Sequence, residues 1–325
     1  MSGEPSFNRT KSLVEGALFA ALVIISYVAD LGTGLLVWLA PIPIAIICFR
    51  HGAGNALMTS VAAALGVGMI LGLFSGISVL TGITAIGIAV GLCLKKNYSD
   101  VKSVALVILG VLLSLAAVLL TGVVVSGISV TGLGSDLLAM VDTSIEGAME
   151  IYRASGLSTD QINTLGQMLA QLKDTLIRLF PAIFVIACSV VSALYVFLTK
   201  FIVRKMGFKF SEVEPFIKWR LPWTFIWGLI SGLALLVVGN IIEQNTLTYI
   251  GINLTFIFGF IYMVQGVSVI YSLMDKYKVS KIFKVFLVIM LFMLGEFQVM
   301  VAIFGLSDIW LDWRSRLSGE DNKTE

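Results

Sequence analysis

The sequence contains 325 residues, of which 58% are hydrophobic and only 13% are charged, and its mean hydropathy is +0.98. Because about a quarter of the residues in a typical soluble domain are charged, this composition excludes a soluble globular protein and a disordered chain. The 22 basic residues barely exceed the 20 acidic ones, for a net charge of +2, so no polybasic face is available to bind nucleic acid. We therefore expect an all-α, polytopic integral membrane protein whose surroundings are the lipid bilayer.

The residue types that usually carry catalysis or bind metals are rare. The three cysteines, Cys48, Cys93 and Cys188, each lie in an apolar run, and no two have the spacing of metal ligands. The single histidine, His51, follows Arg50 at the end of an apolar stretch, where it is interpreted as a residue at headgroup level. No phosphate-binding loop of the form G-x-x-x-x-G-K-[ST] occurs. We expect no catalytic residue, no metal and no cofactor, and therefore not an enzyme; an ATP-driven step would need a partner ATPase.

Hydropathy predicts about nine membrane spans, since a transmembrane helix needs about 20 mostly apolar residues. In chain order the candidates are residues 13–29, 34–49, 53–74, 76–94, 101–128, 179–203, 221–239, 247–274 and 285–305. The second carries Pro41 and Pro43, and the last is interrupted by Glu296 and Gln298, so eight spans are the alternative. The first is expected to be an uncleaved helix, because the bulky Tyr27 stands where a signal-peptide cleavage site needs a small residue.

These spans divide the chain into four predicted parts. Residues 1–128 form a five-span part, residues 129–178 a helical hairpin outside the membrane, residues 179–305 a part of about four spans, and residues 306–325 a polar tail. Basic residues gather in the loops that share a side with the N-terminus, whereas the hairpin has six acids against three bases. Because cytoplasmic loops are enriched in Lys and Arg, we expect the N-terminus in the cytoplasm. The side of the C-terminus stays open.

The hairpin is predicted to consist of two amphipathic helices. Apolar residues at helical spacing mark the first helix, and Ser158 with Gln161 forms a capping box that begins the second. The second helix then continues at alternating three- and four-residue steps, which is coiled-coil spacing, through Ile162, Leu165 and Leu169. Two interpretations stand: an outward-facing lid or partner surface, or a hairpin that folds on itself or lies on the bilayer.

Polar residues within or beside the spans are the candidates for a ligand site, because a charged group at the bilayer centre costs about 2.5–3.5 kcal/mol on insertion scales. Asp30 follows the first span in a glycine-rich loop, and Ser75 and Ser78 lie after the third span on the same predicted outer side. Glu296 falls inside the last span. We assign these four residues as candidate substrate-binding residues. The neutral amides, such as Asn253, are better explained by hydrogen bonds between helices.

Short motifs in a fixed order give the sequence a family resemblance. They are Glu15-Gly16-Ala17, Pro41-x-Pro43, Arg50-His51-Gly52, Arg220-Leu221-Pro222, Asn253, Gln265-Gly266 and the terminal Gly305-Leu306-x-Asp308-Ile309-x-x-Asp312-x-Arg314. Together they resemble the YybS-like family of bacterial membrane proteins, a domain of unknown function, over almost the whole chain. The resemblance implies a multi-pass protein of the bacterial inner membrane and little about its chemistry.

A second resemblance concerns the first six spans. Ala17-x-x-x-Ala21 in the first span is similar to the Ala-x-x-x-Ala motif of the S components of energy-coupling-factor transporters, which are six-helix bundles. It implies that Ala17 and Ala21 contact a transmembrane coupling subunit, which works with ATPases. It also implies a small-molecule site under the loops after spans one, three and five. The chain departs from that family by about three further spans and by a much longer fifth loop.

Two functions follow as expectations. The first is a small-solute-binding or transport component that needs separate energising subunits and acts by alternating exposure of its site. The alternative is a non-transport scaffold or envelope-assembly protein that binds partners through the outer hairpin. Transport predicts a polar cavity that opens outward, whereas a scaffold predicts an exposed apolar stripe on the hairpin.

Overall fold

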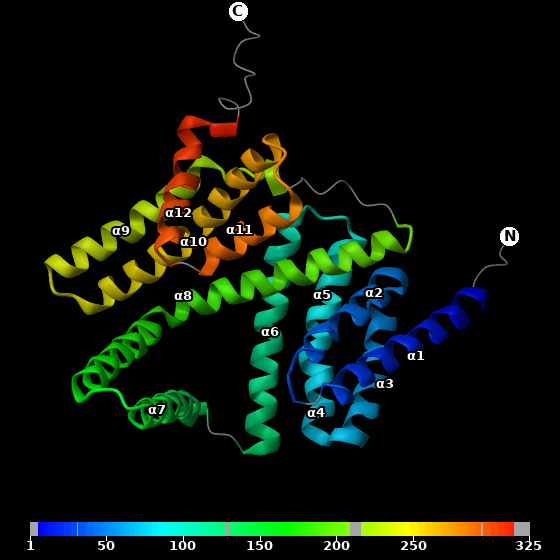
Figure 1. Ribbon diagram of the computed structural model, residues 1–325. Coiled ribbons are helices and arrows are strands. Elements are labelled where there is room, and N and C mark those ends of the chain that lie inside the picture. The colour runs from blue at the N-terminus through cyan, green and yellow to red at the C-terminus, as the bar shows by residue number, and fades with distance from the viewer. Residues whose placement is uncertain (1–5, 31, 128–129, 209–215, 294, 315–325) are drawn as a thin grey trace, which may run out of the picture. The chain divides into compact units, whose positions relative to one another are not determined.

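The computed structural model describes residues 6–30, 32–127, 130–208, 216–293 and 295–314 (Figure 1). These residues form helices and contain no strand, which confirms the all-α class. Seven of the described helices are long and apolar enough to cross a membrane, and Val37–His51 and Phe297–Leu311 are shorter apolar helices. The described chain divides into two compact units, residues 1–166 with 187–211 and residues 167–186 with 212–325.

The first unit is built from the N-terminal helices. In chain order these are α1 (Ser6–Val28), α2 (Pro41–His51), α3 (Ala53–Leu71), α4 (Leu73–Ser78), the π-helical turn η2 (Val79–Ile83), α5 (Thr84–Lys95), α6 (Asp100–Ser126), α7 (Val130–Ala154) and the first and last parts of α8 (Thr159–Lys205). α1 packs on α3, α2 on α5, and α5 on α6. The C-terminal part of α8 adds Cys188, Tyr195 and Val203 to the core formed by α2, α5 and α6.

Glycines let α5 approach α2 closely. A Cβ atom on Gly87 would lie 2.6 Å from Cβ of Ile44, and one on Gly91 would lie 2.4 Å from Cβ of Cys48. Ile44 and Cys48 are both fully buried. Small residues at a helix contact allow the two backbones to approach closely, which favours association of helices in a membrane. Gly87 and Gly91 are therefore packing residues.

Two predicted spans are subdivided. Pro41 occupies the first turn of α2, where its missing N–H costs no helical hydrogen bond, and the short helix η1 (Val37–Leu39) precedes it. The predicted fourth span is not a uniform α-helix, because η2 interrupts it between α4 and α5. The hydroxyl of Thr84 donates to the carbonyl oxygen of Val79 at 3.0 Å and so satisfies one backbone group of that turn.

The predicted hairpin is helical, and its capping box is present. The hydroxyl of Ser158 accepts from the N–H of Gln161 at 3.3 Å, and the side chain of Gln161 accepts from the N–H of Ser158 at 3.0 Å. Its second helix does not end before the sixth span, because α8 runs without interruption through Pro181 to Lys205. The helix of the hairpin and the sixth span are thus one element of 47 residues.

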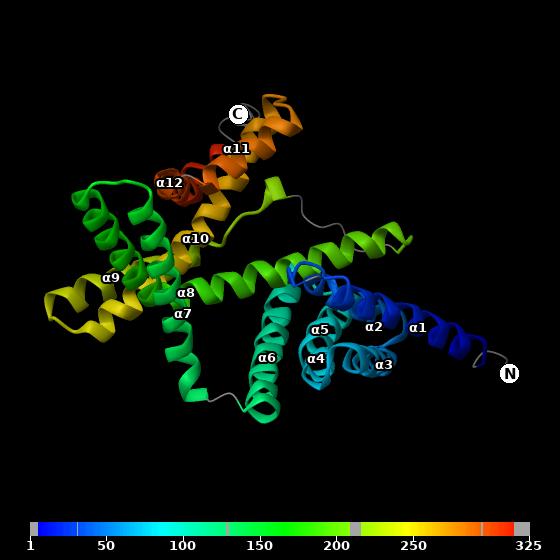
Figure 2. The same cartoon turned by 60° about the horizontal axis from the view of Figure 1, so that its bottom comes forward.

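The second unit contains α9 (Ile226–Ile241), α10 (Asn245–Lys276), α11 (Lys281–Met293) and α12 (Gly295–Leu311), with the short helices η3 (Phe216–Lys218) and η4 (Trp223–Phe225). α9 and α10 lie side by side in both views (Figures 1 and 2), and α12 packs on the other part of α10. The sequence predicts one span over residues 285–305, whereas the structure has two helices there, α11 and α12. Leu294, between them, lies outside the described residues.

Candidate functional site

The first helix has one buried and one exposed face. Ser12, Gly16, Ala20 and Val23 recur every three or four residues and are buried. The face fits closely against α3, because a Cβ atom on Gly16 would lie 2.9 Å from the hydroxyl oxygen of Thr59. α1 is therefore held in the first unit by one side only.

Ala17 and Ala21 lie on the exposed face of α1. They are one helical turn apart, and the larger Leu13, Leu18 and Ile25 around them are each about 60% exposed. Two small side chains between larger apolar ones make a shallow strip against which a second helix can pack closely. The same helix buries Ala20, so its alanines fall into two classes with different neighbours.

Asp30 organises the loop that follows α1. Its Oδ1 accepts from the hydroxyl of Thr33 at 2.7 Å and from the N–H of Leu36 at 3.3 Å, and the residue is buried. The hydrogen bond from Thr33 is the main reason that the pKa of the Asp30 carboxyl lies below its ordinary value of 3.8. Gly32 and Gly34 both have positive φ, a conformation that favours glycine. The structure thus gives Asp30 a defined role in holding this loop together.

The hydroxyls of the two candidate serines bind backbone carbonyl groups four residues earlier in the chain. Ser75 donates to the carbonyl oxygen of Leu71 at 3.3 Å, and Ser78 donates to that of Phe74 at 2.8 Å. Both side chains are half-buried. Glu296 lies in the first turn of α12, in the second unit, and its side chain lies outside the described residues.

One polar cluster of the first unit was not identified as such from the sequence. The carboxylate of Glu15 in α1 pairs with Arg50 at 2.9 Å and with Nε2 of His51 at 2.7 Å, at the end of α2. Asn55 donates to the carbonyl oxygen of His51 at 2.8 Å. The side chain of His51 is 17% exposed. The sequence did contain a signal for this cluster: an acid, Glu15, at the start of the first span and the basic pair Arg50-His51 at the end of the second.

A second polar cluster lies in the second unit, around Arg314. Its guanidinium donates to the carbonyl oxygens of Ile217 and Trp219 and pairs with Asp308 at 3.4 Å. Gln265 of α10 donates to Asp308 at 3.4 Å. Burial lowers the pKa of Arg314 below its ordinary value, and the negative charge of Asp308 opposes that effect. The cluster ties the end of α12 and the segment before η4 to α10.

Neither cluster has the composition of a metal site. Among the residues that the structure describes, no group of three or more His, Cys, Asp or Glu side chains could hold a metal ion. Each cluster instead contains an arginine paired with a carboxylate, together with side chains that donate to backbone carbonyl oxygens. We therefore interpret both clusters as contacts that hold helices in place.

Comparison with known proteins identifies the family. The model of the predicted membrane protein family DUF2232 matches residues 17–309. The chain belongs to this family. The uncharacterised protein YybS of Bacillus subtilis (strain 168) is 24% identical over 319 residues, which cover 95% of this chain and 99% of that protein. No solved structure matches the chain significantly.

The comparison confirms the YybS-like resemblance and an integral membrane protein of an uncharacterised family. The matched region contains Ala17, Asp30, Arg50 and Asp308, whereas Glu15 of the first polar cluster lies just before its first matched residue. Arg314 lies just beyond its last matched residue.

Proposed function

We propose that the protein is a small-solute-binding or transport component that docks onto a separate transmembrane coupling subunit through α1, with ATPases as the energising partners. The observation that supports this proposal is the exposure of Ala17 and Ala21. The resemblance to energy-coupling-factor S components requires both alanines on the free side of the first helix. An alanine strip buried against α3 would have counted against the proposal.

The arrangement of the first unit also supports this function. The helices α1, α2, α3, α4–α5 and α6 and the last part of α8 correspond in order to six predicted spans, and they share two hydrophobic clusters. We place the solute under the loops that follow α1 and α3. There Asp30 would hold its loop in one conformation, and Ser75 and Ser78 would lie at the second loop. Glu296 lies in the second unit and stays a separate candidate for binding a ligand.

In the same proposal the N-terminus and the Lys- and Arg-rich loops face the cytoplasm of a bacterial cell, and the loops after α1 and α3 face outward. The protein itself makes and breaks no covalent bond and needs no metal or cofactor. Transport then depends on alternating exposure of the solute site, driven by the partner ATPases.

Co-purification from native membranes tests the docking step. Ala17→Leu or Ala21→Leu should abolish recovery of a complex that contains a transmembrane subunit and ATPases, while the variant itself stays folded. Ala62→Leu on α3 is the matched control, because it adds the same side chain at another exposed alanine. If no ATPase-containing complex is recovered with the wild type, or if Ala17→Leu and Ala62→Leu recover it equally, the proposal fails.

Ala20→Leu separates docking from folding. Ala20 is 5% exposed, so the added volume overpacks the contact with α3 at a cost of about 1–3 kcal/mol. We expect a lower Tm for Ala20→Leu and an unchanged Tm for Ala17→Leu. A lowered Tm for both variants would show that the exposed strip is needed for the bundle itself.

A scaffold function is the second candidate, supported by the hairpin. Several large apolar residues of α7 and of residues 159–178 of α8 are exposed: Leu138, Met140, Val141, Ile151, Met168, Leu172 and Leu176. Each of the two helices thus offers apolar side chains to which a partner could bind, as a scaffold function requires. Replacement of Val141 and Leu172 by Ser should then release an extracytoplasmic partner that chemical cross-linking captures, and it should leave recovery of an ATPase complex unchanged.

A further inference from the structure

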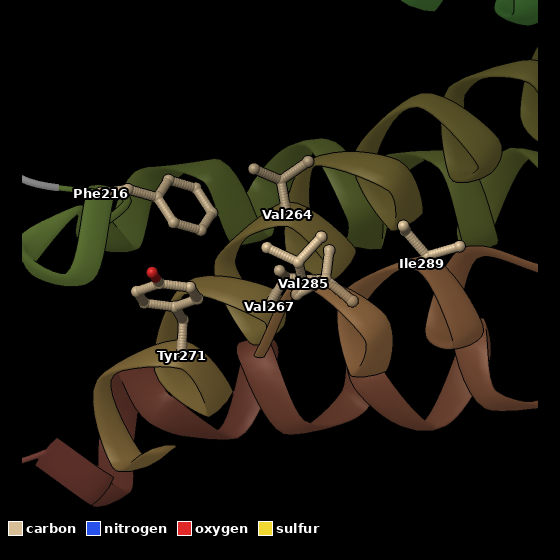
Figure 3. A pocket seen from close by; sticks show the side chains of 7 residues that line it. Phe216, Val264, Val267, Tyr271, Val285 and Ile289 are labelled. Atoms are coloured by element: carbon tan, nitrogen blue, oxygen red, sulfur yellow. The ribbon is translucent and has the colours of Figure 1, made fainter. Parts of the chain in front are cut away.

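The second unit contains an apolar cavity of about 310 Å³ between α10, α11 and η3. Its lining residues are Phe216, Val264, Val267, Tyr271, Val285, Val288 and Ile289 (Figure 3). The figure shows the rings of Phe216 and Tyr271 at one end and the valines of α10 and α11 converging beyond them. A cavity of this lining offers a sugar, nucleotide or amino acid almost no hydrogen bond, whereas it suits a hydrocarbon chain.

Positive charge lies at the aromatic end of this cavity. The ammonium of Lys284 lies 5.0 Å from the centre of the Tyr271 ring, and it pairs with Asp275 at 2.5 Å. Residues 275–284 contain four lysines against one aspartate. Three of these lysines, Lys276, Lys278 and Lys281, are exposed. The end of α10 and the start of α11 therefore form a basic surface beside an apolar cavity.

Helical spacing places one lysine directly in line with the cavity. On α11, Lys281 precedes Val285 by four residues and Val288 by seven, so the three residues share one face of the helix. Val285 and Val288 line the cavity. Lys281 thus stands one turn beyond the lining, at the end where Lys284 and Tyr271 also lie.

We propose that this cavity binds one acyl chain of an anionic phospholipid whose headgroup lies on the lysines of residues 276–284. The acyl chain replaces contacts that an empty apolar cavity would lose. The phosphate is attracted to the basic surface, as is typical of lysine clusters that flank membrane helices. Both ends of the ligand are specified by adjacent residues, and the site is independent of the solute and coupling functions proposed above.

Native mass spectrometry of the purified full chain tests the site. The protein is released from detergent in the presence of phosphatidylglycerol, of phosphatidylcholine, or of phosphatidylglycerol with inorganic phosphate, and retained lipid is counted. We expect tighter retention of phosphatidylglycerol than of phosphatidylcholine, with no effect of inorganic phosphate. Equal retention of the two lipids by the wild type, or competition by inorganic phosphate alone, overturns the proposal.

Two variants examine the two ends of the ligand. Lys281→Gln should weaken phosphatidylglycerol about fivefold and leave phosphatidylcholine unchanged, because one lysine near a membrane surface contributes a factor of that order. Lys11→Gln, an exposed lysine of the first unit, is the matched control. Val288→Phe fills the cavity and should reduce retention of both lipids, whereas Ile282→Phe, at an 85% exposed position of the same helix, should not.

Folding of each variant is checked by its Tm without added lipid. Because Lys281 is exposed, we expect Lys281→Gln to have the Tm of the wild type, so a change in lipid retention reports the lost charge. If Lys281→Gln and Lys11→Gln retain phosphatidylglycerol equally, the headgroup does not lie on this surface and the proposal is wrong. If folded Val288→Phe retains both lipids as the wild type does, the acyl chain does not occupy the cavity.

Discussion

The side-chain amide of Asn253 in α10 repairs the gap that Pro181 leaves in the hydrogen bonds of α8. Its Oδ1 accepts from the N–H of Ala182 at 2.9 Å, and its Nδ2 donates to the carbonyl oxygen of Arg178 at 2.8 Å. A proline inside a helix lacks an N–H and pushes the preceding turn away, which frees backbone groups that need partners in a membrane. One amide therefore supplies both a donor and an acceptor where α8 has lost them.

We expect Asn253→Leu to destabilise the protein by about 1–3 kcal/mol, because it leaves an N–H and a carbonyl group buried without partners. The loss should be smaller in a Pro181→Ala background, where the helix can form its own hydrogen bonds. Unfolding in denaturing detergent measures the four proteins of this double-mutant cycle.

Asn240→Leu is the control for the amide, since Asn240 is an exposed residue near the end of α9. It should leave the free energy of unfolding within about 0.5 kcal/mol of the wild type. Equal effects of Asn253→Leu with and without Pro181 would show that the amide stabilises α8 by some other contact.

A second prediction concerns the contact of α10 with α12. A Cβ atom on Gly305 would lie 2.1 Å from the carbonyl oxygen of Tyr262 and 2.5 Å from the backbone nitrogen of Gly266. Backbone atoms cannot move aside as a flexible side chain can, so Gly305→Ala must separate the two helices. We expect a loss of at least about 1–3 kcal/mol, the usual cost of overpacking, measured by the same unfolding assay.

Gly259 provides the matched comparison within α10. A Cβ atom there meets nothing within 4 Å, and alanine is the better helix former by about 1 kcal/mol. Gly259→Ala should therefore be neutral or stabilising. If Gly259→Ala and Gly305→Ala cost the same, helix propensity rather than helix contact decides the effect.

These two contacts show which parts of the structure the sequence could predict. Local signals were sufficient for the apolar spans, for Pro41 at the start of a helix and for the capping box of Ser158 and Gln161, because each depends on residues within a few positions. The continuity of α8 was missed because Pro181 is normally a helix breaker. The amide that compensates for the proline is that of Asn253, 71 residues after Ala182, whose N–H it accepts.

The candidate sites were harder to predict for the same reason. Hydropathy locates spans but does not say which helices are neighbours, so the pairing of Glu15 with His51, 36 residues apart, could not be derived. Arg314 and Gln265 were noted as family motifs, yet their connection through Asp308 depends on the packing of α12 against α10. The polar side chains at Asp30 and Ser75 were located by sequence, whereas their use of local hydrogen bonds was not.

The Asp30 loop should depend on pH with a defined sign. The pKa of Asp30 is lowered in the folded protein, so its contribution to stability is fully present above the ordinary value of 3.8 and is lost as the pH falls through the folded value. The Tm of the wild type should exceed that of Asp30→Asn at neutral pH. The difference should shrink below about pH 4 and vanish at lower pH.

Asp136→Asn is the control for this measurement, because Asp136 is an exposed carboxylate of α7. Its Tm should follow the wild type across the whole pH range. A constant difference between the wild type and Asp30→Asn at every pH would mean that the asparagine disturbs the loop by its shape rather than by the loss of charge.

The last prediction concerns Glu15, which joins α1 to the end of α2. Its carboxylate and the side chain of Arg50 are 16% and 21% exposed, so this ion pair is better shielded from solvent than a surface pair. Glu15→Leu removes the partner of both Arg50 and His51, and a hydrogen bond to a charged group contributes about 1.5–3 kcal/mol. We expect a loss of that size, and a coupling energy with Arg50→Met that persists in high salt because shielded pairs are screened weakly. Glu146→Leu on the exposed side of α7 is the control and should change stability by less than about 0.5 kcal/mol. A coupling energy near zero, or one that disappears in 1 M salt, would mean that α1 is fastened to α2 by its apolar face alone.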